Sequence, residues 1–362
     1  MSVDLVGVSV VCDAGVLRSA LTVVKAGVAR KPTNAVLAGV VLGSGRVRGF
    51  DYEVDAEHLV PELAGMPDIL VDYLALVNVL KGVKGAVSFA VAGDYLMVTT
   101  PTGVSPLNVL PVEDFPAPPL LDLGAGVSLP VSRFVPVLTA IGKDKTLPVL
   151  TAVSLQSLHG VIEIAATDRY RLGVVSAGDG EIPTVLIPGS FVKHMVKVHK
   201  GECVHIAPDK SGSMMEFRVG VARYMVRLLD GTFPKYESLI PTQFQWDISI
   251  NRAAMISAVD SASAYCTRNT PVRLDLAGGE LVVSVKNGDG VPPARWVVGQ
   301  GVAPLGVEET HAFNPDYLLD CLRALDGVEV KWSMNMPTKP SVFTGDDTGV
   351  TLLVMPVRLS GI

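Results

Sequence analysis

The sequence offers few side chains that could bind a metal. The best candidate ligands are His194, His199 and Cys203. The two histidines are five positions apart on a predicted helix, so they point to different faces, whereas a helical metal-binding pair needs a spacing of four. The four cysteines show no CxxC spacing, which indicates neither a zinc ribbon nor a disulfide framework and is typical of a reducing compartment. The sequence therefore predicts no metal site and no cofactor.

Carboxylates that could act as general acids or bases are also scattered. Asp168, together with the histidines, supports a hydrolase as an alternative interpretation. However, Asp51 and Glu53 occupy the matching place in another part of a repeated pattern, which fits a structural hairpin better. Nucleophile-elbow, Walker A and dinucleotide-binding glycine motifs do not occur in the sequence. We predict that the protein is not an enzyme and has no catalytic residues.

The composition is that of a globular chain. Its 362 residues are 49% hydrophobic and 18% charged, which indicates two or three domains. The first residues carry an early aspartate and do not resemble a signal peptide, and no apolar run is long enough for a membrane helix. We therefore expect a cytoplasmic protein without a membrane partner.

One pattern occurs three times along the chain, at intervals of about 115–120 residues. Each copy contains two helix-like segments, in which apolar residues are spaced i, i+4, i+7 as at Leu17, Leu21 and Val24. The six predicted helices cover residues 14–31, 71–84, 131–145, 187–200, 251–268 and 313–326. Strand-like stretches rich in Val, Leu and Ile separate them, with turns such as 43–45 and 287–290.

This pattern predicts an α+β fold in three tandem copies, each with two helices packed on antiparallel sheets. The predicted domains are residues 1–122, 123–243 and 244–362.

The charge of the chain is segregated. Its net charge of −6 argues mildly against a nucleic-acid partner, but the six helix-like segments contain fifteen basic and six acidic residues. Those segments therefore carry +9 and the rest of the chain −15. A lysine and arginine surface is what a protein needs to hold duplex DNA by its phosphates, and no motif for reading bases is present. We predict sequence-independent DNA binding, with least contribution from the sixth segment, which is net acidic.

The candidate DNA-facing residues are the basic residues of the first five helix-like segments. They are Arg18, Lys25, Arg30, Lys31, Lys81, Lys84, Arg133, Lys143, Lys145, Lys193, Lys197, Lys200, Arg252 and Arg268. A ring-shaped protein-interaction scaffold that does not tether DNA is the second alternative interpretation, because lysines and arginines also decorate ordinary solvent-facing helices.

Four stretches of the chain resemble the bacterial β sliding clamp, the beta subunit of DNA polymerase III. They are residues 30–33 (RKPT), 166–172 (ATDRYRL), 230–236 (DGTFPKY) and 354–359 (VMPVRL). The resemblance implies three domains of the DNA-clamp fold per subunit and a head-to-tail homodimer that forms a ring of six domains around duplex DNA. It also implies a processivity factor whose partners are the replicative DNA polymerase, an ATP-driven clamp loader and other proteins with a clamp-binding linear motif.

The same resemblance implies a hydrophobic pocket for the partner peptide between the second and third domains. The matching residues are Leu150, Thr167, Arg171, Leu172, Pro234, Leu239, Ser341, Val342, Val354, Met355, Pro356, Val357 and Arg358. Arg169 and Tyr170 depart from the small residue and the histidine expected at these positions. The loop at residues 142–148 lacks the aromatic residues of the family and carries Lys143 and Lys145, so we expect phosphate attraction to replace stacking there.

Overall fold

The computed structural model describes residues 10–267, 270–286, 292–304 and 306–359. The chain divides into two compact units. The first contains Met1–Val131 and Lys193–Leu228, and the second contains Ser132–Val192 and Leu229–Ile362. The turn predicted at 287–290 lies outside the described residues.

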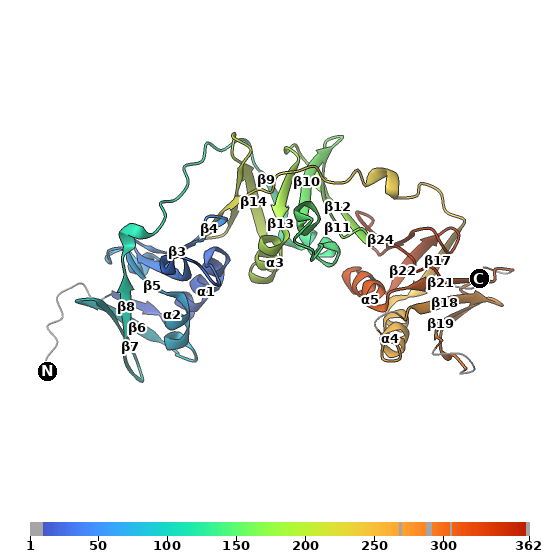
Figure 1. Cartoon of the computed structure of the whole chain (residues 1–362), viewed down its shortest axis with the longest axis horizontal. Helices are drawn as coiled ribbons and strands as arrows, with labels where there is room; N and C mark the ends of the chain where they lie inside the picture. The colour runs from blue at the N-terminus through green and yellow to red at the C-terminus, as the bar shows by residue number, and fades with distance from the viewer. Residues whose placement is uncertain (1–9, 268–269, 287–291, 305, 360–362) are drawn as a thin grey trace. The chain divides into compact units, whose positions relative to one another are not determined.

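One order of elements occurs three times along the chain, and Figure 1 labels many of these elements. Each copy has one strand, a helical segment, four strands, a helix and three strands. The first copy contains β1 (Val10–Asp13), α1 (Ala14–Val24), β2 (Gly39–Gly43), β3 (Arg46–Phe50), β4 (Val54–Leu59), β5 (Ile69–Asp72), α2 (Tyr73–Leu80), β6 (Ala86–Ala92), β7 (Tyr95–Thr100) and β8 (Gly103–Leu110).

The second and third copies repeat this order. The second contains β9 (Val127–Pro130), the 3₁₀ segments η5 (Val131–Phe134) and η6 (Pro136–Ala140), β10 (Ala152–Leu158), β11 (Val161–Thr167), β12 (Arg171–Asp179), β13 (Val185–Pro188), α3 (Gly189–Val198), β14 (Cys203–Pro208), β15 (Met214–Val219) and β16 (Ala222–Arg227). The third contains β17 (Trp246–Asn251), α4 (Arg252–Ser263), β18 (Val272–Ala277), β19 (Glu280–Val285), β20 (Ala294–Gln300), β21 (Glu309–Phe313), α5 (Pro315–Ala324), β22 (Glu329–Met334), β23 (Ser341–Thr344) and β24 (Val350–Val354). The predicted α+β class and its repetition are confirmed.

The helices are shorter than the sequence pattern predicts, and one prediction is wrong. Residues 131–145 contain no α-helix but the two 3₁₀ segments, followed by a loop. Pro136 lies inside this segment and has no backbone N–H to donate to a helical hydrogen bond. The segments predicted at 71–84, 251–268 and 313–326 begin in strands, because the helix starts only after its capping residue, which is Asp72, Asn251 or Asn314.

Side-chain caps define where the helices begin. The carboxylate of Asp13 accepts hydrogen bonds from the N–H groups of Gly15 and Val16 at the start of α1. Asp72, Asn251 and Asn314 cap α2, α4 and α5 in the same way. Asp and Asn are preferred at this position because their oxygens satisfy N–H groups that have no partner within the helix.

Antiparallel sheets continue from one copy into the next. In the first unit, twelve strands follow the order β1-β6-β7-β8-β5-β2-β3-β4-β16-β15-β14-β9. In the second unit, eight strands follow the order β13-β10-β11-β12-β24-β23-β22-β17, and β20-β19-β18-β21 form a separate sheet. Two pairings join successive copies, β4 with β16 and β12 with β24. We call them the β4–β16 seam and the β12–β24 seam.

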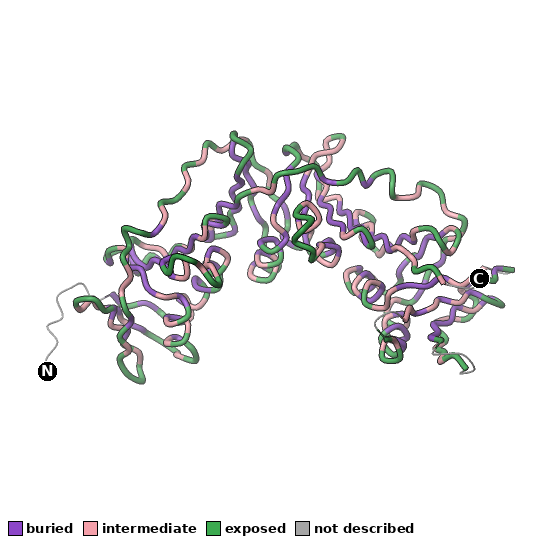
Figure 2. Tube along the Cα trace, viewed as in Figure 1, coloured by how far each residue is buried: buried purple, intermediate pink, exposed green. Residues whose placement is uncertain are grey.

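The helices bury the apolar stripes that the sequence predicts. Leu17, Leu21 and Val24 of α1 are buried, as are Met255 and Val259 of α4. Figure 2 shows the buried strands and the largely exposed segments that connect the copies. In the described part of the chain, no helix is long and apolar enough to cross a membrane.

Candidate functional site

A tight turn between β11 and β12 begins the site. The Asp168 Oδ1 atom accepts hydrogen bonds from the N–H groups of Tyr170 (3.0 Å) and Arg171 (2.8 Å). Arg169 adopts a φ of +79°, in the left-handed region that non-glycine residues rarely occupy. Asp168 therefore holds a backbone turn and is not a free acid or base, which removes the basis of the hydrolase interpretation.

Arg171 lies beneath this turn in a network of charges. Its guanidinium binds the Asp168 carboxylate at 2.9 and 3.1 Å and Asp320 of α5 at 2.8 Å. It also stacks over the ring of Tyr317, 4.2 Å from the ring centroid. Arg171 is buried, and its hydrogen bonds go to groups of its own chain, so it positions the turn against α5.

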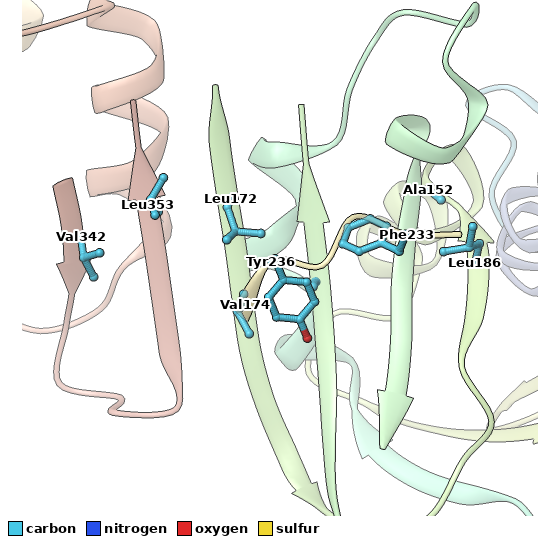
Figure 3. Close-up of a cluster of buried hydrophobic side chains, with 9 residues drawn as sticks. Ala152, Leu172, Val174, Leu186, Phe233, Tyr236, Val342 and Leu353 are labelled. Atoms are coloured by element: carbon cyan, nitrogen blue, oxygen red, sulfur yellow. The ribbon is translucent and has the colours of Figure 1, made fainter. Parts of the chain in front are cut away.

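The β12–β24 seam presents an apolar face. Leu172 lies opposite Leu353, and Leu353 lies opposite Val342, so these three side chains share one face of the sheet. They belong to a buried cluster, the seam cluster, shown in Figure 3: Ala152, Ala165, Leu172, Val174, Leu186, Phe233, Tyr236, Val342 and Leu353. Val149, Leu229, Ile240, Phe244 and Met355 pack against it and are partly buried.

The segment that follows β16 runs over this face. Phe233 and Tyr236 pack against the strands with their rings 6.0 Å apart, in the arrangement that Figure 3 shows. The Tyr236 hydroxyl donates to Glu163 at 2.5 Å and accepts from the Gln156 amide at 2.8 Å. Burial, followed by the hydrogen bond to Glu163, raises the pKa of Tyr236. The phenol therefore stays protonated and holds this segment in place.

The structure brings only some of the predicted pocket residues together. Leu172 and Val342 belong to the seam cluster, Met355 packs against it, and the Thr167 side chain lies on the same face, opposite Leu172. Around them, Leu150 and Pro356 are partly buried, whereas Pro234, Leu239, Val357 and Arg358 are exposed.

Three predicted pocket residues lie elsewhere. They are Arg171, Val354 and Ser341, which pair with one another across the seam at the register position next to that of Leu172, Leu353 and Val342. Because neighbouring positions of a strand point to opposite faces, these three side chains project from the other face of the sheet. Phe233 and Tyr236, which pack over the apolar face, are not among the residues that the resemblance implies. The sequence signal for these two residues is the DGTFPKY stretch, because its two aromatic side chains are the ones that cover the apolar face of the seam.

The β4–β16 seam repeats this architecture with different chemistry. The Asp51 carboxylate forms the same turn as Asp168, and Tyr52 has a φ of +72°. Counting from the two turns, Asp55 stands where Leu172 stands in the β12–β24 seam. By the same register, Met225 matches Leu353 and Glu216 matches Val342.

Charge pairs flank the β4–β16 seam on both sides. Arg48 binds the buried Asp55 carboxylate through two hydrogen bonds, of 2.8 and 2.9 Å. It also donates to the Pro116 carbonyl at 3.0 Å. Arg218 and Arg223 both bind the buried Glu216 carboxylate. The two seams thus share a backbone arrangement, but only the β12–β24 seam offers an apolar face.

The candidate DNA-facing residues fall into two groups. Arg18 donates to the carbonyl of Leu80, the last residue of α2, and to that of Val83. Arg252 donates to the carbonyl of Leu322 in α5 and to that of Gly327 just after it. Arg133 binds the Asp347 carboxylate and a backbone carbonyl. These three arginines hold the fold together. The exposed group consists of Lys25, Arg30, Lys31, Lys81, Lys84, Lys143, Lys145, Lys193, Lys197 and Lys200, and Arg268 lies outside the described residues.

The candidate metal ligands do not meet. His194 Nε2 lies 3.1 Å from the Val23 carbonyl, and the buried His199 binds the Tyr224 hydroxyl at 2.7 Å and Glu202 at 3.1 Å. Cys203 is exposed on β14. Across the described ranges, no cluster of three or more His, Cys, Asp or Glu residues could hold a metal ion.

Comparisons with known proteins agree along the chain. The sequence model of the central domain of the DNA polymerase III beta subunit matches residues 134–235, and that of its C-terminal domain matches residues 237–358. The beta sliding clamp of Streptomyces coelicolor is 32% identical over 91% of this chain and 94% of that protein. A beta sliding clamp homolog of Streptomyces muensis, GriR, is 28% identical over 95% of this chain and 97% of its own length.

Solved structures show the same fold. The Bacillus subtilis sliding clamp has a TM-score of 0.85 at 22% identity and covers 98% of this chain and 100% of its own. The Pseudomonas aeruginosa clamp bound to griselimycin has a TM-score of 0.86, with the same identity and the same coverage.

Three copies of one unit, sheets shared between copies and an apolar face without catalytic groups define a binding protein built from repeats. The relatives specify which one. The chain belongs to the beta sliding clamp family. It is a DNA sliding clamp, a processivity factor of DNA replication and not an enzyme.

Proposed function

We propose that two copies of this chain form a head-to-tail ring around duplex DNA and hold the replicative polymerase on it. Each subunit contributes three clamp domains, at residues 1–122, 123–243 and 244–362. A clamp loader opens the ring, and other DNA-processing proteins use the same docking site. We place the protein in the cytoplasm, consistent with its four free cysteines.

The apolar face of the β12–β24 seam carries the docking part of this proposal. Leu172, Leu353 and Val342 line up across three adjacent strands, and Met355 packs beside them. Leu239 and Val357 are large apolar residues that remain 52% and 38% exposed. A peptide with hydrophobic anchors could cover such side chains and gain about 25 cal/mol for each Å² of apolar surface removed from water.

The exposed lysines support the DNA part. Lys197 and Lys200 of the α3 region and Lys81 and Lys84 after α2 are exposed in the first unit. Exposed lysines bind phosphates without reading bases, and the affinity that they provide falls steeply as the salt concentration rises. A closed ring does not need strong contacts, because it is retained on DNA by its topology.

Retention on circular DNA tests the ring. The clamp, loaded by its clamp loader onto nicked circular duplex, should stay bound through gel filtration in about 0.5 M salt, where phosphate contacts alone fail. Cutting the circle once should release it, because the ring slides off the ends. Equal retention on circular and linear DNA would mean simple electrostatic binding. If the protein is retained on neither, the scaffold interpretation is correct.

Peptide binding tests the docking site separately. The variant Met355→Ala should bind a fluorescent peptide with two hydrophobic anchors roughly ten-fold more weakly, since truncation of a central apolar contact costs about 1–2 kcal/mol. Met336→Ala is the matched control, because Met336 is 56% exposed and does not belong to the seam cluster. Equal affinities of the two variants would reject the assignment of this face as the docking site.

A further inference from the structure

Three segments at one end of the β12–β24 seam each carry an exposed basic residue. Ser341, Val354 and Arg171 lie in register on adjacent strands, so the segments next to them leave the sheet at one edge. These segments are the β11–β12 turn, the residues before β23 and the residues after β24. Each carries an exposed cation, and the three cations are Arg169, Lys339 and Arg358.

The carboxylates at this edge are already engaged. Asp168 and Asp320 both bind the guanidinium of Arg171. Asp144 is close enough for Arg169 to help lower its pKa, after the larger effect of the Thr146 hydroxyl and N–H. Among the described residues, however, Arg169 has no salt bridge within 4.0 Å. Arg169 is therefore the cation at this edge that remains available to an acidic partner beside the apolar face.

The turn holds Arg169 in front of the docking face. Its backbone is fixed by the left-handed φ, by the Asp168 hydrogen bonds on one side and by the Thr167 hydroxyl, which accepts from the Arg169 N–H at 3.2 Å. The next carbonyl, that of Tyr170, accepts from the Met355 N–H at 2.8 Å. Met355 packs against the seam cluster, so the turn and the docking face adjoin.

We propose that Arg169 makes this docking site selective for partner peptides that carry an acidic residue beside their hydrophobic anchors. The inference rests on the proposed docking function and deepens it by naming the chemistry of the partner. Lys339 and Arg358 add to the attraction, and Arg169 provides the selectivity because a rigid turn holds it next to Met355. A guanidinium can also bind a carboxylate through two parallel hydrogen bonds, which adds geometric specificity.

A double-mutant cycle with full-length protein tests this. Two synthetic peptides share the same hydrophobic anchors and differ only in one flanking residue, Glu in the first and Gln in the second. At about 0.1 M salt the unsubstituted protein should bind the Glu peptide about 2- to 5-fold more tightly, which is the range of an exposed ion pair. The preference should disappear in Arg169→Gln and shrink at about 0.5 M salt.

Two further variants keep the outcomes distinct. Arg169→Gly is a second variant whose residue suits the positive φ, so it reports the loss of charge without added backbone strain. Arg227→Gln removes an exposed arginine outside the unit that holds the seam and should leave the preference intact. If both peptides bind the unsubstituted protein equally, or if Arg169→Gln keeps the preference, the selectivity is refuted while docking stands. If neither peptide binds, the docking function itself fails.

Discussion

Arg171 belongs to a family motif, but its side chain supports the fold and does not face the docking site. The resemblance places it in the peptide pocket, but the structure buries it on the other face of the seam, between Asp168, Asp320 and the ring of Tyr317. We expect Arg171→Ala to lower the free energy of unfolding by about 3 kcal/mol, because it leaves a largely buried Asp168 charge without its partner. Chemical denaturation monitored by circular dichroism measures this loss.

Arg169→Ala is the natural control for that experiment. Arg169 is exposed and belongs to the same turn, so its truncation should change the unfolding free energy by no more than about 0.5 kcal/mol. Similar losses in the two variants would mean that the turn, and not the buried charge network, is what Arg171 supports.

Two partly buried histidines predict how stability depends on pH. Burial lowers the pKa of His58 and of His194, and repulsion from His199 contributes in both. In the unfolded chain these imidazoles take up protons below about pH 6.5, whereas in the folded protein they do so only at lower pH. Stability should therefore be unaffected above that pH and should fall as the pH decreases below it.

Thermal denaturation between pH 5.5 and 7.5 measures this dependence. The variant His194→Gln keeps a side chain that can donate to the Val23 carbonyl but cannot titrate. Its melting temperature should fall less on acidification than that of the unsubstituted protein. An unchanged slope would assign the pH dependence to other groups.

At the scale of elements, the apolar spacing was sufficient to find five of the six helical segments. Leu17, Leu21 and Val24 are buried as the spacing predicts. The spacing could not locate the helix ends, because these depend on single capping side chains such as Asp72 and Asn314. It failed at residues 131–145 because a proline interrupts the hydrogen bonds of a segment whose apolar residues are still buried by tertiary packing.

The candidate site was predictable only in part, for a similar reason. Motif similarity identifies which residues are near the seam, but the face on which each side chain lies depends on strand register. A shift of one position separates Leu172 from Arg171 and Leu353 from Val354. The contribution of Tyr236 depends on Glu163 and Gln156, which are distant in the sequence and come close only in the folded sheet.

The β4–β16 seam gives a prediction at this scale. Arg48 and Asp55 are both buried and join neighbouring strands. Asp55→Asn keeps the shape but leaves the Arg48 charge unpaired, and we expect a loss of about 3 kcal/mol in unfolding free energy. Glu57→Gln is the matched control on the same strand, since its contact with Arg46 is longer, at 3.5 Å, and partly exposed, and should cost less than about 1 kcal/mol. Comparable losses would show that burial does not distinguish the two pairs.

At the scale of the whole molecule, the repetition indicates how a ring would close. In the first seam β4 of the first copy pairs with β16 of the second, and in the other seam β12 of the second copy pairs with β24 of the third. In both cases the third strand after the first helical segment of one copy pairs with the last strand of the next copy. By this rule β20 requires a partner, yet among the described residues it pairs only with β19. Within the described ranges, the last strand of the first copy, β8, pairs only with β5 and β7 of its own copy. We therefore expect β20 to pair with β8 of a second subunit, in a head-to-tail contact that closes a ring.

A charge placed on that edge should open the ring. Val297 on β20 and Val104 on β8 are apolar and 59% and 56% exposed in the single chain. Val297→Glu would bury an unpaired carboxylate on closure, so the dimer dissociation constant should rise roughly 100-fold, in line with the cost of such a charge. Val328→Glu is the control, because Val328 is 74% exposed and belongs to no strand. Sedimentation at one concentration should give monomers for Val297→Glu and dimers for Val328→Glu. Dimers in both would place the closing contact on another surface, and the strand rule that predicts β8 as the partner of β20 would have to be abandoned.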